Sequence, residues 1–465
     1  MLRKLGEKFT AIFLRIMPDS YVFALALTLI AGLVALIWMK SSPLEIIVAW
    51  YDGFFDLLSF GMQIVLIIIT GFSIALSPAI NKGIDKLSVY VNKPGQVYFF
   101  VTLVGALLCL VSFGWVVVTS VLARQLALRV KGLNYPYLVA CVYVSMGSWV
   151  LGLSSSIPLL LNTDKNYLIE AGVLNTVIPT SYTLGSILNI AMIITFVVVA
   201  PLLMYVLSPK DASLQQIDDL KDETTTSSNL SIKEEAQGLK LPFKALSDTL
   251  NNSFVLQLVI AMMGLSYVIY HFSSNGFELN FNIMIFIFLM TGLLLHKTPM
   301  RFVIAMKRSS SNVSGILFQY PFYAGIMGIM LYTGLGKEFA LLMASVATEN
   351  TYPFFAFVAG GFVNFAIPSA GGEFAVIGPS IIEAVKEIGA GISGANTTEM
   401  IARASLSIAY GESLSNFMQP FYLLLVFPIM GAGVKLQPRD VIGYLFIPLV
   451  IFFILQVLLV TYMPL

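Results

Sequence analysis

Long runs of apolar residues, each about the length of a membrane-spanning helix, recur along the whole chain. One such stretch, residues 62–76 (MQIVLIIITGFSIAL), lacks the strict apolar–polar alternation that a membrane β-strand requires. The pattern therefore predicts an all-α polytopic membrane protein. We expect about nine crossing helices, at residues 20–38, 57–80, 136–161, 183–207, 253–272, 278–296, 312–335, 397–430 and 439–463.

Two further apolar stretches, 97–130 and 353–387, are each about 34 residues long. A straight helix of that length would measure about 50 Å, well beyond the hydrocarbon core of roughly 30 Å. Ser-Phe-Gly interrupts the first stretch at 112–114, and Pro-Ser-Ala-Gly-Gly interrupts the second at 368–372. We therefore predict two re-entrant helical hairpins, each of which enters and leaves the membrane on the same side.

The chain repeats its pattern after an offset of roughly 256 to 262 residues. An approach helix, a hairpin, a broken helix that ends in proline and a last helix follow one another in residues 18–207 and again in 278–465. Because a connecting transmembrane helix at 251–277 separates them, the two repeats are predicted to be inverted. Inverted repeats with broken helices are the architecture of secondary transporters.

Two segments outside the repeats have a different composition. Residues 1–17 place cations and apolar residues at helical spacing, which predicts an interfacial helix that lies on the membrane. Residues 208–250 are rich in charge and almost free of aromatic side chains, so we predict a cytoplasmic linker without fixed structure. A regulatory binding segment is the alternative interpretation of this stretch.

Composition and charge agree with a membrane protein. Hydrophobic residues make up 58% of the chain and charged residues only 11%, whereas soluble domains carry about 25% charged residues. The net charge of +1, without a basic cluster outside the membrane flanks, argues against a nucleic-acid partner. With a cytoplasmic N-terminus and a periplasmic C-terminus, 21 of the 26 cations fall on the inner side, as the positive-inside rule requires. We expect a multi-pass protein of the bacterial inner membrane.

Metal and enzyme chemistry have little support in the sequence. Cys109 and Cys141 both lie inside apolar segments, which is typical of small buried residues. His271 and His296 stand at the ends of apolar segments with no other ligand at metal spacing. No nucleophile and base are paired in the way that a membrane-embedded enzyme would need. We therefore predict no enzyme activity, no metal site and no cofactor.

The four breaks in the apolar segments are the candidate functional site. Unwound backbone inside a membrane is tolerated only where it is buried in protein or lines a wet cavity. Glycines, hydroxyls and amides are concentrated at 111–120 and 152–162 in the first repeat and at 364–379 and 409–420 in the second. Glycine, serine and proline also serve helix packing and kinks, but four such clusters at matched positions favour a binding site.

Three sequences at or near these breaks carry a family resemblance: NFAIPSAGGEFAVIGP (364–379), SIAYGESLSNFMQPF (407–421) and GLLLHKTPM (292–300). They resemble the short-chain fatty acid transporter family, the acetoacetate and butyrate permeases of bacterial inner membranes. The resemblance implies a member of the ion transporter superfamily, with paired re-entrant hairpins and a homodimer. The chain departs from the family pattern at Glu373 and Phe374, where His and Trp often follow the paired glycines.

The resemblance implies a short monocarboxylate substrate with one charge and a small apolar tail. Main-chain N–H groups and hydroxyls at the start of a half-helix, where the helix dipole is positive, are expected to hold the carboxylate. Phe113, Trp115 and Trp149 are candidates to bound the tail, although single aromatic residues more often serve packing. The candidate substrate-binding residues are Asn364, Ser369, Gly371, Gly372, Ser413, Asn416 and Gln419 in the second repeat and Ser154, Ser155 and Ser156 in the first.

Glu373 and Glu412 are the carboxylates nearest the breaks, and intramembrane carboxylates are costly enough to suggest a function such as proton transfer. We expect them to carry a coupling H⁺, unless they only stabilise a hairpin backbone. Main-chain carbonyls around Ser112 or Ser413 could instead hold Na⁺, so both coupling ions stay open. Asp52 and Asp56, one helical turn apart, are interpreted as interfacial.

Two other transport functions compete with monocarboxylate uptake. A larger or doubly charged anion, as in the dicarboxylate and aminobenzoyl-glutamate branches of the superfamily, would need a basic partner that the breaks lack. A passive channel would not need matched hairpins. One methylene changes binding by only about 1 to 3 kcal/mol, so acetate, butyrate and acetoacetate are all candidate substrates.

Overall fold

The computed structural model describes most of the chain. Within the described part every regular element is a helix, apart from a single β-bridge between Lys221 and Val434. The predicted interfacial helix at 1–17 lies outside the described residues. The described residues are 20–56, 58–153, 155–163, 166–170, 172–209, 215–221, 231–241, 243, 245–276, 281–310, 313–368 and 370–465.

Several helices are long and apolar enough to cross a membrane. Five such spans occur among the described residues, and a sixth is present if one bent pair is counted as a single span. The five are Pro94–Val111, Tyr135–Leu161, Ile187–Leu207, Phe254–Ser274 and Pro438–Tyr462. The bent pair, Thr397–Met418 with Leu423–Met430, turns by 46° at the predicted break. The protein is therefore a multi-pass membrane protein, while the count of nine crossings stays a prediction.

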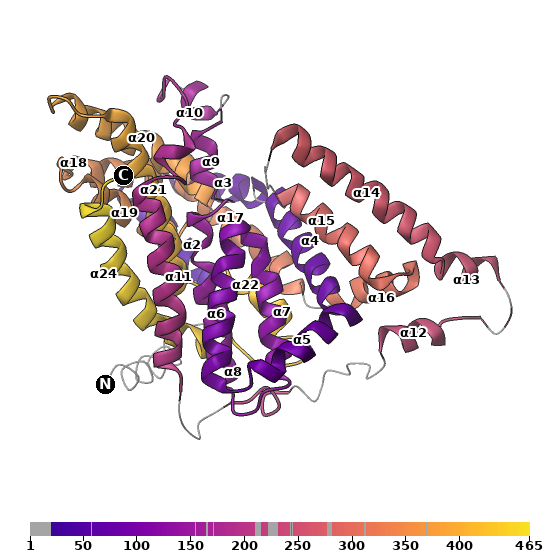
Figure 1. Cartoon of the computed structure of the whole chain (residues 1–465). Helices are drawn as coiled ribbons and strands as arrows, with labels where there is room; N and C mark the ends of the chain where they lie inside the picture. Colours follow the sequence, from indigo (N-terminus) through magenta and orange to yellow (C-terminus); the bar gives the residue numbers. More distant parts are fainter. Residues whose placement is uncertain are drawn as a thin grey trace.

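Both predicted hairpin stretches are divided into two helices. In the first, α6 (Pro94–Val111) ends where Ser112 adopts an extended conformation, and a short 3-10 turn η1 (Phe113–Trp115) leads into α7 (Val116–Ala127). The arms α6 and α7 lie side by side (Figure 1). In the second, α19 (Tyr352–Val363) and α20 (Ala370–Ala390) also contact each other. The predicted breaks are confirmed, although α6 alone is as long as a full span.

The helix order of the first half recurs in the second. After the first hairpin come α8 (Tyr135–Met146), the 3-10 turn η2 (Trp149–Leu151), α9 (Ser156–Leu161) and α11 (Ile187–Leu207). After the second come α21 (Thr397–Ser415), η4 (Asn416–Met418), α22 (Leu423–Met430) and α24 (Phe446–Tyr462). Each half therefore contains a hairpin, a helix broken by a 3-10 turn and a final helix.

The two halves exchange the ends of their broken helices. Helix α9 packs on α20 and α21 of the second half, while α22 packs on α7 and α8 of the first. The Arg124 guanidinium on α7 donates to the main-chain oxygens of Ile429 (2.6 Å), Met430 (3.2 Å) and Ala432 (2.6 Å), at the end of α22. Lys386 on α20 donates in the same way to the oxygen of Val173, in the segment that follows α9. Each hairpin thus contacts the chain of the other half through a cation, and Arg124 lies at the C-terminal end of α22, a favourable place for positive charge.

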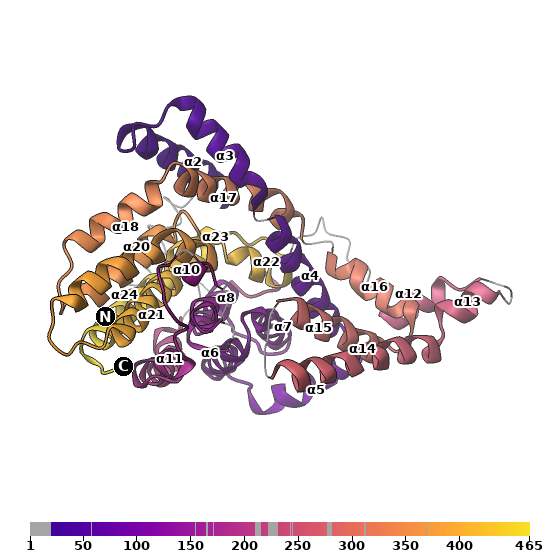
Figure 2. The same ribbon diagram turned by 90° about the horizontal axis from the view of Figure 1, so that it is seen from above.

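The second hairpin and the second broken helix pack closely. A Cβ atom added at Gly411 of α21 would come within 1.9 Å of the main-chain oxygen of Phe357 on α19. Only glycine permits this approach, so the helices that carry the second-half breaks are held at a short separation. The central helices α8 and α21 are surrounded by other helices when seen from above (Figure 2).

The other helices flank this central group. Helices α2 (Ser20–Ile37) and α3 (Pro43–Asp56) pack on α17 (Ser314–Tyr332) along one edge (Figure 2). A second flank comprises α4 (Leu58–Ala75), α5 (Pro78–Tyr90), α14 (Phe254–Asn275), α15 (Phe281–His296) and α16 (Pro299–Ser310). His296, at the end of α15, connects this helix to α4, because its Nε2 lies 2.7 Å from the main-chain oxygen of Ser73. The remaining helices are α10 (Tyr167–Glu170), α12 (Ile232–Gly238), α13 (Leu246–Asn251), α18 (Leu335–Ser345) and α23 (Pro438–Ile442).

The linker is more ordered in its described parts than its composition predicts. The Tyr135 N–H donates to the oxygen of Gln215 at 2.8 Å, and the Lys435 N–H donates to the oxygen of Leu220 at 2.7 Å. These main-chain hydrogen bonds attach residues 215–221 to the start of α8 and to the loop after α22. Our expectation of a linker without fixed structure was therefore wrong for this segment, because backbone pairing does not depend on the side chains that composition counts.

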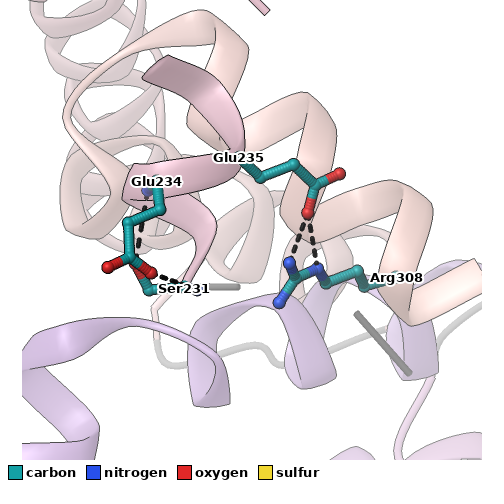
Figure 3. A network of polar contacts seen from close by, with 4 residues as sticks. All are labelled: Ser231, Glu234, Glu235 and Arg308. Atoms are coloured by element: carbon teal, nitrogen blue, oxygen red, sulfur yellow. Dashed lines mark hydrogen bonds and ion pairs between the residues drawn. The ribbon is translucent and has the colours of Figure 1, made fainter. Parts of the chain in front are cut away.

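Helix α12, in the linker, also packs on α16. Figure 3 shows the Arg308 guanidinium of α16 in contact with the Glu235 carboxylate. Two of its nitrogens, Nε and Nη2, donate to the same carboxylate oxygen, and the distance from Nε is 3.1 Å. The helix begins with a capping box, in which the Ser231 N–H donates to the Glu234 carboxylate at 2.8 Å and the Glu234 N–H donates to the Ser231 hydroxyl. These contacts with Ser231 lower the pKa of Glu234. The linker thus contains a short capped helix docked on α16.

Candidate functional site

The two broken helices meet at their break points. The Ser413 hydroxyl of α21 donates to the main-chain oxygen of Gly147 at 2.9 Å. The Tyr143 hydroxyl of α8 donates to the main-chain oxygens of Asn416 (2.8 Å) and Gln419 (3.0 Å), in the break that follows α21. Residues 143–152 and 411–422 therefore form one buried unit, which we refer to as the central junction.

Three amide side chains line the second-half side of this junction. Asn364 lies just past the end of α19, and Asn416 and Gln419 lie in the break after α21; all three are almost fully buried. The Asn416 Oδ1 accepts from Asn364 Nδ2 (2.6 Å) and from Gln419 Nε2 (2.7 Å). The Asn364 Oδ1, the Gln419 Oε1 and the Asn416 Nδ2 have no hydrogen-bond partner among the described residues. The cluster is thus preorganised and still has free polar atoms.

Two carboxylates accompany the amides. Glu373 stands in the first turn of α20 and Glu412 near the end of α21, and both are fully buried. They lie close enough to interact electrostatically with each other and with Tyr422, whose hydroxyl donates to the oxygen of Pro368 at 3.0 Å. None of the four carboxylate oxygens has a hydrogen-bond partner in the described structure. An unpaired buried carboxylate is very costly in its charged form, so burial of these groups favours their neutral form or a neighbouring positive charge.

Aromatic side chains from the first-half breaks also contact the central junction. The Phe113 ring lies 5.2 Å from the Trp149 ring and 5.5 Å from the Tyr422 ring, both in edge-on geometry. The Leu153 N–H donates to the oxygen of Leu110 at 2.8 Å, and an added Cβ at Gly152 would come within 1.9 Å of that oxygen. Glycine at position 152 therefore lets the break after α8 contact the end of α6.

The predicted site residues are only partly brought together. Asn364, Glu373, Glu412, Ser413, Asn416 and Gln419 are buried in or against the central junction. Ser112 and Ser155 are buried at the first-half breaks, whereas Ser156 and Gly372 are half-buried and Gly371 is exposed. Ser154 and Ser369 lie outside the described residues.

Sequence reasoning missed Tyr143 and Tyr422. Their hydroxyls donate to main-chain oxygens at the second-half breaks and so fix the geometry of the junction. A single tyrosine in an apolar segment carries no pattern that would distinguish it from a packing residue. The available signal was the breaks themselves: main-chain carbonyls that a broken helix leaves unpaired need hydrogen-bond donors from elsewhere in the chain, and a tyrosine hydroxyl is such a donor.

These features define a multi-pass α-helical membrane protein with a polar site enclosed between two broken helices. A sequence model of the family described as "Short chain fatty acid transporter" matches residues 1–463. The chain belongs to the short-chain fatty acid transporter family. The family is one of transporters rather than enzymes, in agreement with the sequence analysis.

Two curated relatives match over nearly their whole length, and both are named "Putative short-chain fatty acid transporter". The protein from Escherichia coli is 34% identical over 446 residues, and the protein from Haemophilus influenzae is 32% identical over 449 residues; each match covers 96% of both chains.

Two solved structures are also similar over nearly their whole length. The Alcanivorax borkumensis YdaH transporter is 15% identical with a TM-score of 0.43, and the match covers 96% of this chain and 98% of that one. Neisseria gonorrhoeae MtrF, whose structure is described as that of an antimetabolite efflux pump, is 13% identical with a TM-score of 0.43, and the match covers 100% and 98% of the two chains.

Proposed function

We propose that this chain carries short-chain monocarboxylates, such as butyrate and acetoacetate, across the bacterial inner membrane by cation-coupled uptake. The observation that carries the proposal is the central junction, where unpaired buried polar atoms from both halves converge. Family membership and the names of the two relatives favour the substrate class. The Lys- and Arg-free sequences of 143–152 and 411–422 favour one negative charge over two, because a second carboxylate would need a basic partner.

Glu373 and Glu412 are the proposed coupling residues. Their oxygens are buried without partners in the described part, so a proton or Na⁺ that binds there is strongly favoured over the empty charged state. The unpaired oxygens of Asn364 and Gln419 add neutral acceptors beside them. Ser112, at the end of α6, supplies a further oxygen from the first half. Glu373 stands where histidine is frequent in the family pattern. This position would therefore determine which coupling ion the chain uses.

The proposed substrate-binding residues are those predicted from the sequence in the junction and at the start of α20. We assign alternating access to movement of one inverted repeat against the other, with re-entrant hairpins that close the site from opposite sides. The exchange of α9 and α22 between the halves supports this assignment, since each hairpin contacts the broken helix of the other half. We also propose a homodimer and a cytoplasmic N-terminus, on the resemblance and the cation distribution.

Uptake into proteoliposomes tests the proposal. Labelled butyrate should accumulate above its external concentration when a pH gradient or a Na⁺ gradient is imposed, and it should only equilibrate without either. Unlabelled acetoacetate should compete, whereas succinate should not. Accumulation of succinate in place of butyrate would transfer the assignment to the dicarboxylate class, and equilibration under both gradients would remove cation coupling.

A further inference from the structure

Trp149 has a buried donor that nothing in the described structure satisfies. The residue lies in the 3-10 turn η2 with 7% of its surface exposed, and its Nε1 has no hydrogen-bond acceptor among the described residues. An indole nitrogen is a donor only, so a cation cannot satisfy it. Burying such a group without an acceptor is costly, so a ligand that supplies an acceptor there is favoured.

The position of Trp149 places this donor beside the central junction. Its ring contacts Phe113 at 5.2 Å, and Phe113 contacts Tyr422 at 5.5 Å. Two residues before it, Gly147 accepts the hydrogen bond from Ser413. The indole therefore stands on the first-half side of the junction, across Phe113 and Tyr422 from the carboxylates of the second half.

The unpaired buried polar atoms differ in kind between the two sides of the junction: hydrogen-bond donors lie on one side and mostly acceptors on the other. In the first half they are the donors Trp149 Nε1, beside the junction, and Trp115 Nε1, in the turn η1. On the second-half side, among the described residues, they are the acceptor oxygens of Glu373, Glu412, Asn364 and Gln419 together with one donor, the Asn416 Nδ2. An anion is attracted to the first set and repelled by the second. A coupled substrate anion and cation would thus be held on opposite sides of one site.

We infer that the substrate carboxylate accepts a hydrogen bond from the indole N–H of Trp149. This inference rests on the proposed function and names the group that recognises the anion. Trp149 is preferred to Trp115 because Trp149 is more than nine-tenths buried, whereas Trp115 is half-buried. Phe113, packed edge-on against the indole, offers an apolar surface to the short tail.

Substitution of Trp149 by phenylalanine removes the N–H and keeps an aromatic ring against Phe113. The Trp149→Phe protein should show a half-saturating butyrate concentration about tenfold higher, the effect of one hydrogen bond to a charged group, with an unchanged maximal rate. Trp50→Phe is the matched control, because the Trp50 Nε1 is also buried without a partner but lies on α3, outside the junction. Equal half-saturating concentrations in Trp149→Phe and Trp50→Phe would overturn the inference.

A spectroscopic measurement keeps the inference testable if Trp149→Phe does not fold. The chain has four tryptophans, so ¹⁵N-indole labelling of the wild-type protein should give four indole N–H signals in an NMR spectrum. Saturating butyrate should shift the Trp149 signal, which is assigned by its loss in Trp149→Phe or by elimination with Trp38→Phe, Trp50→Phe and Trp115→Phe. A Trp149 signal that does not move would overturn the inference while butyrate uptake persists, whereas a wild-type protein without butyrate uptake would overturn the proposed function itself.

Discussion

Ser413 of the second broken helix donates a hydrogen bond to the main-chain oxygen of Gly147 in the first, at 2.9 Å. This bond joins residues that are 266 positions apart in the sequence, at the point where each helix is interrupted. The interruption frees the Gly147 oxygen from helical pairing, and Ser413 supplies the donor that it then lacks. The two breaks are therefore complementary parts of one structure.

Loss of this hydroxyl should reduce stability. Ser413→Ala leaves the buried Gly147 oxygen without its donor and should lower the free energy of unfolding by about 0.6 to 1.5 kcal/mol. Ser407→Ala is the control, because Ser407 is buried on the same helix but donates to Arg403 within its own helix. Thermal melting in detergent, followed by size-exclusion chromatography, should show the larger decrease for Ser413→Ala. Equal decreases would mean that the cross-helix bond contributes nothing specific.

Arg124 should be among the most important cations for folding. Its guanidinium donates to three main-chain oxygens at the end of α22, so Arg124→Gln should cost about 2 kcal/mol. Arg129→Gln is the control, since Arg129 pairs with the exposed carboxylate of Asp85 and otherwise donates to Gln125, four residues earlier, and such a surface ion pair is worth less than about 1 kcal/mol. The melting temperatures of both variants provide the comparison. A larger decrease in melting temperature for Arg129→Gln would contradict the prediction that Arg124 stabilises the end of α22.

Glu373→Gln should separate coupling from transport. Glutamine keeps the shape of the side chain but cannot take up a proton or supply a charge to Na⁺. The variant should exchange internal for external butyrate while losing accumulation driven by a gradient. Glu383→Gln, an exposed position on the same helix, should retain both activities. Accumulation by Glu373→Gln would show that Glu373 is structural, and the same assay on Glu412→Gln would then decide whether the other carboxylate carries the ion.

The proposed topology can be checked with single cysteines. A cysteine at Gln237 of α12 should react with a membrane-impermeant maleimide only from the cytoplasm, and one at Ser274 near the end of α14 only from the periplasm. Both positions are exposed, and α14 is long enough to cross the membrane between them. The native Cys109 and Cys141 are fully buried, so their background labelling should be low. Labelling of both sites from one side would refute the inversion of the repeats.

The contact between Glu235 and Arg308 should contribute to linker docking but not to transport. A double-mutant cycle with Glu235→Gln and Arg308→Gln should give a coupling energy of about 0.2 to 1 kcal/mol, because both side chains remain partly exposed. Butyrate uptake by Glu235→Gln should equal that of the wild type. A marked loss of uptake with normal membrane insertion would instead favour the regulatory interpretation of the linker.

The sequence predicted the breaks well because they follow from local chemistry. Glycine and proline within apolar runs predicted that α6, α19 and α21 would end there. The amide side chains in the same runs singled out Asn364 and Asn416 as candidate site residues. The partners of these groups could not be predicted, because the hydroxyls of Tyr143 and Tyr422 reach them from helices distant in sequence. The docking of residues 215–221 was missed for a related reason, since it depends on main-chain hydrogen bonds.

The exchange of α9 and α22 makes the molecule resemble a domain-swapped dimer within a single chain. Each hairpin holds a segment of the opposite half, through Arg124 in one direction and Lys386 in the other. Pulling out either segment removes the contacts that it makes with the hairpin and the broken helix of the opposite half. Neither half can therefore open without weakening the other, and denaturation of the membrane core should occur as one cooperative transition rather than as two successive ones.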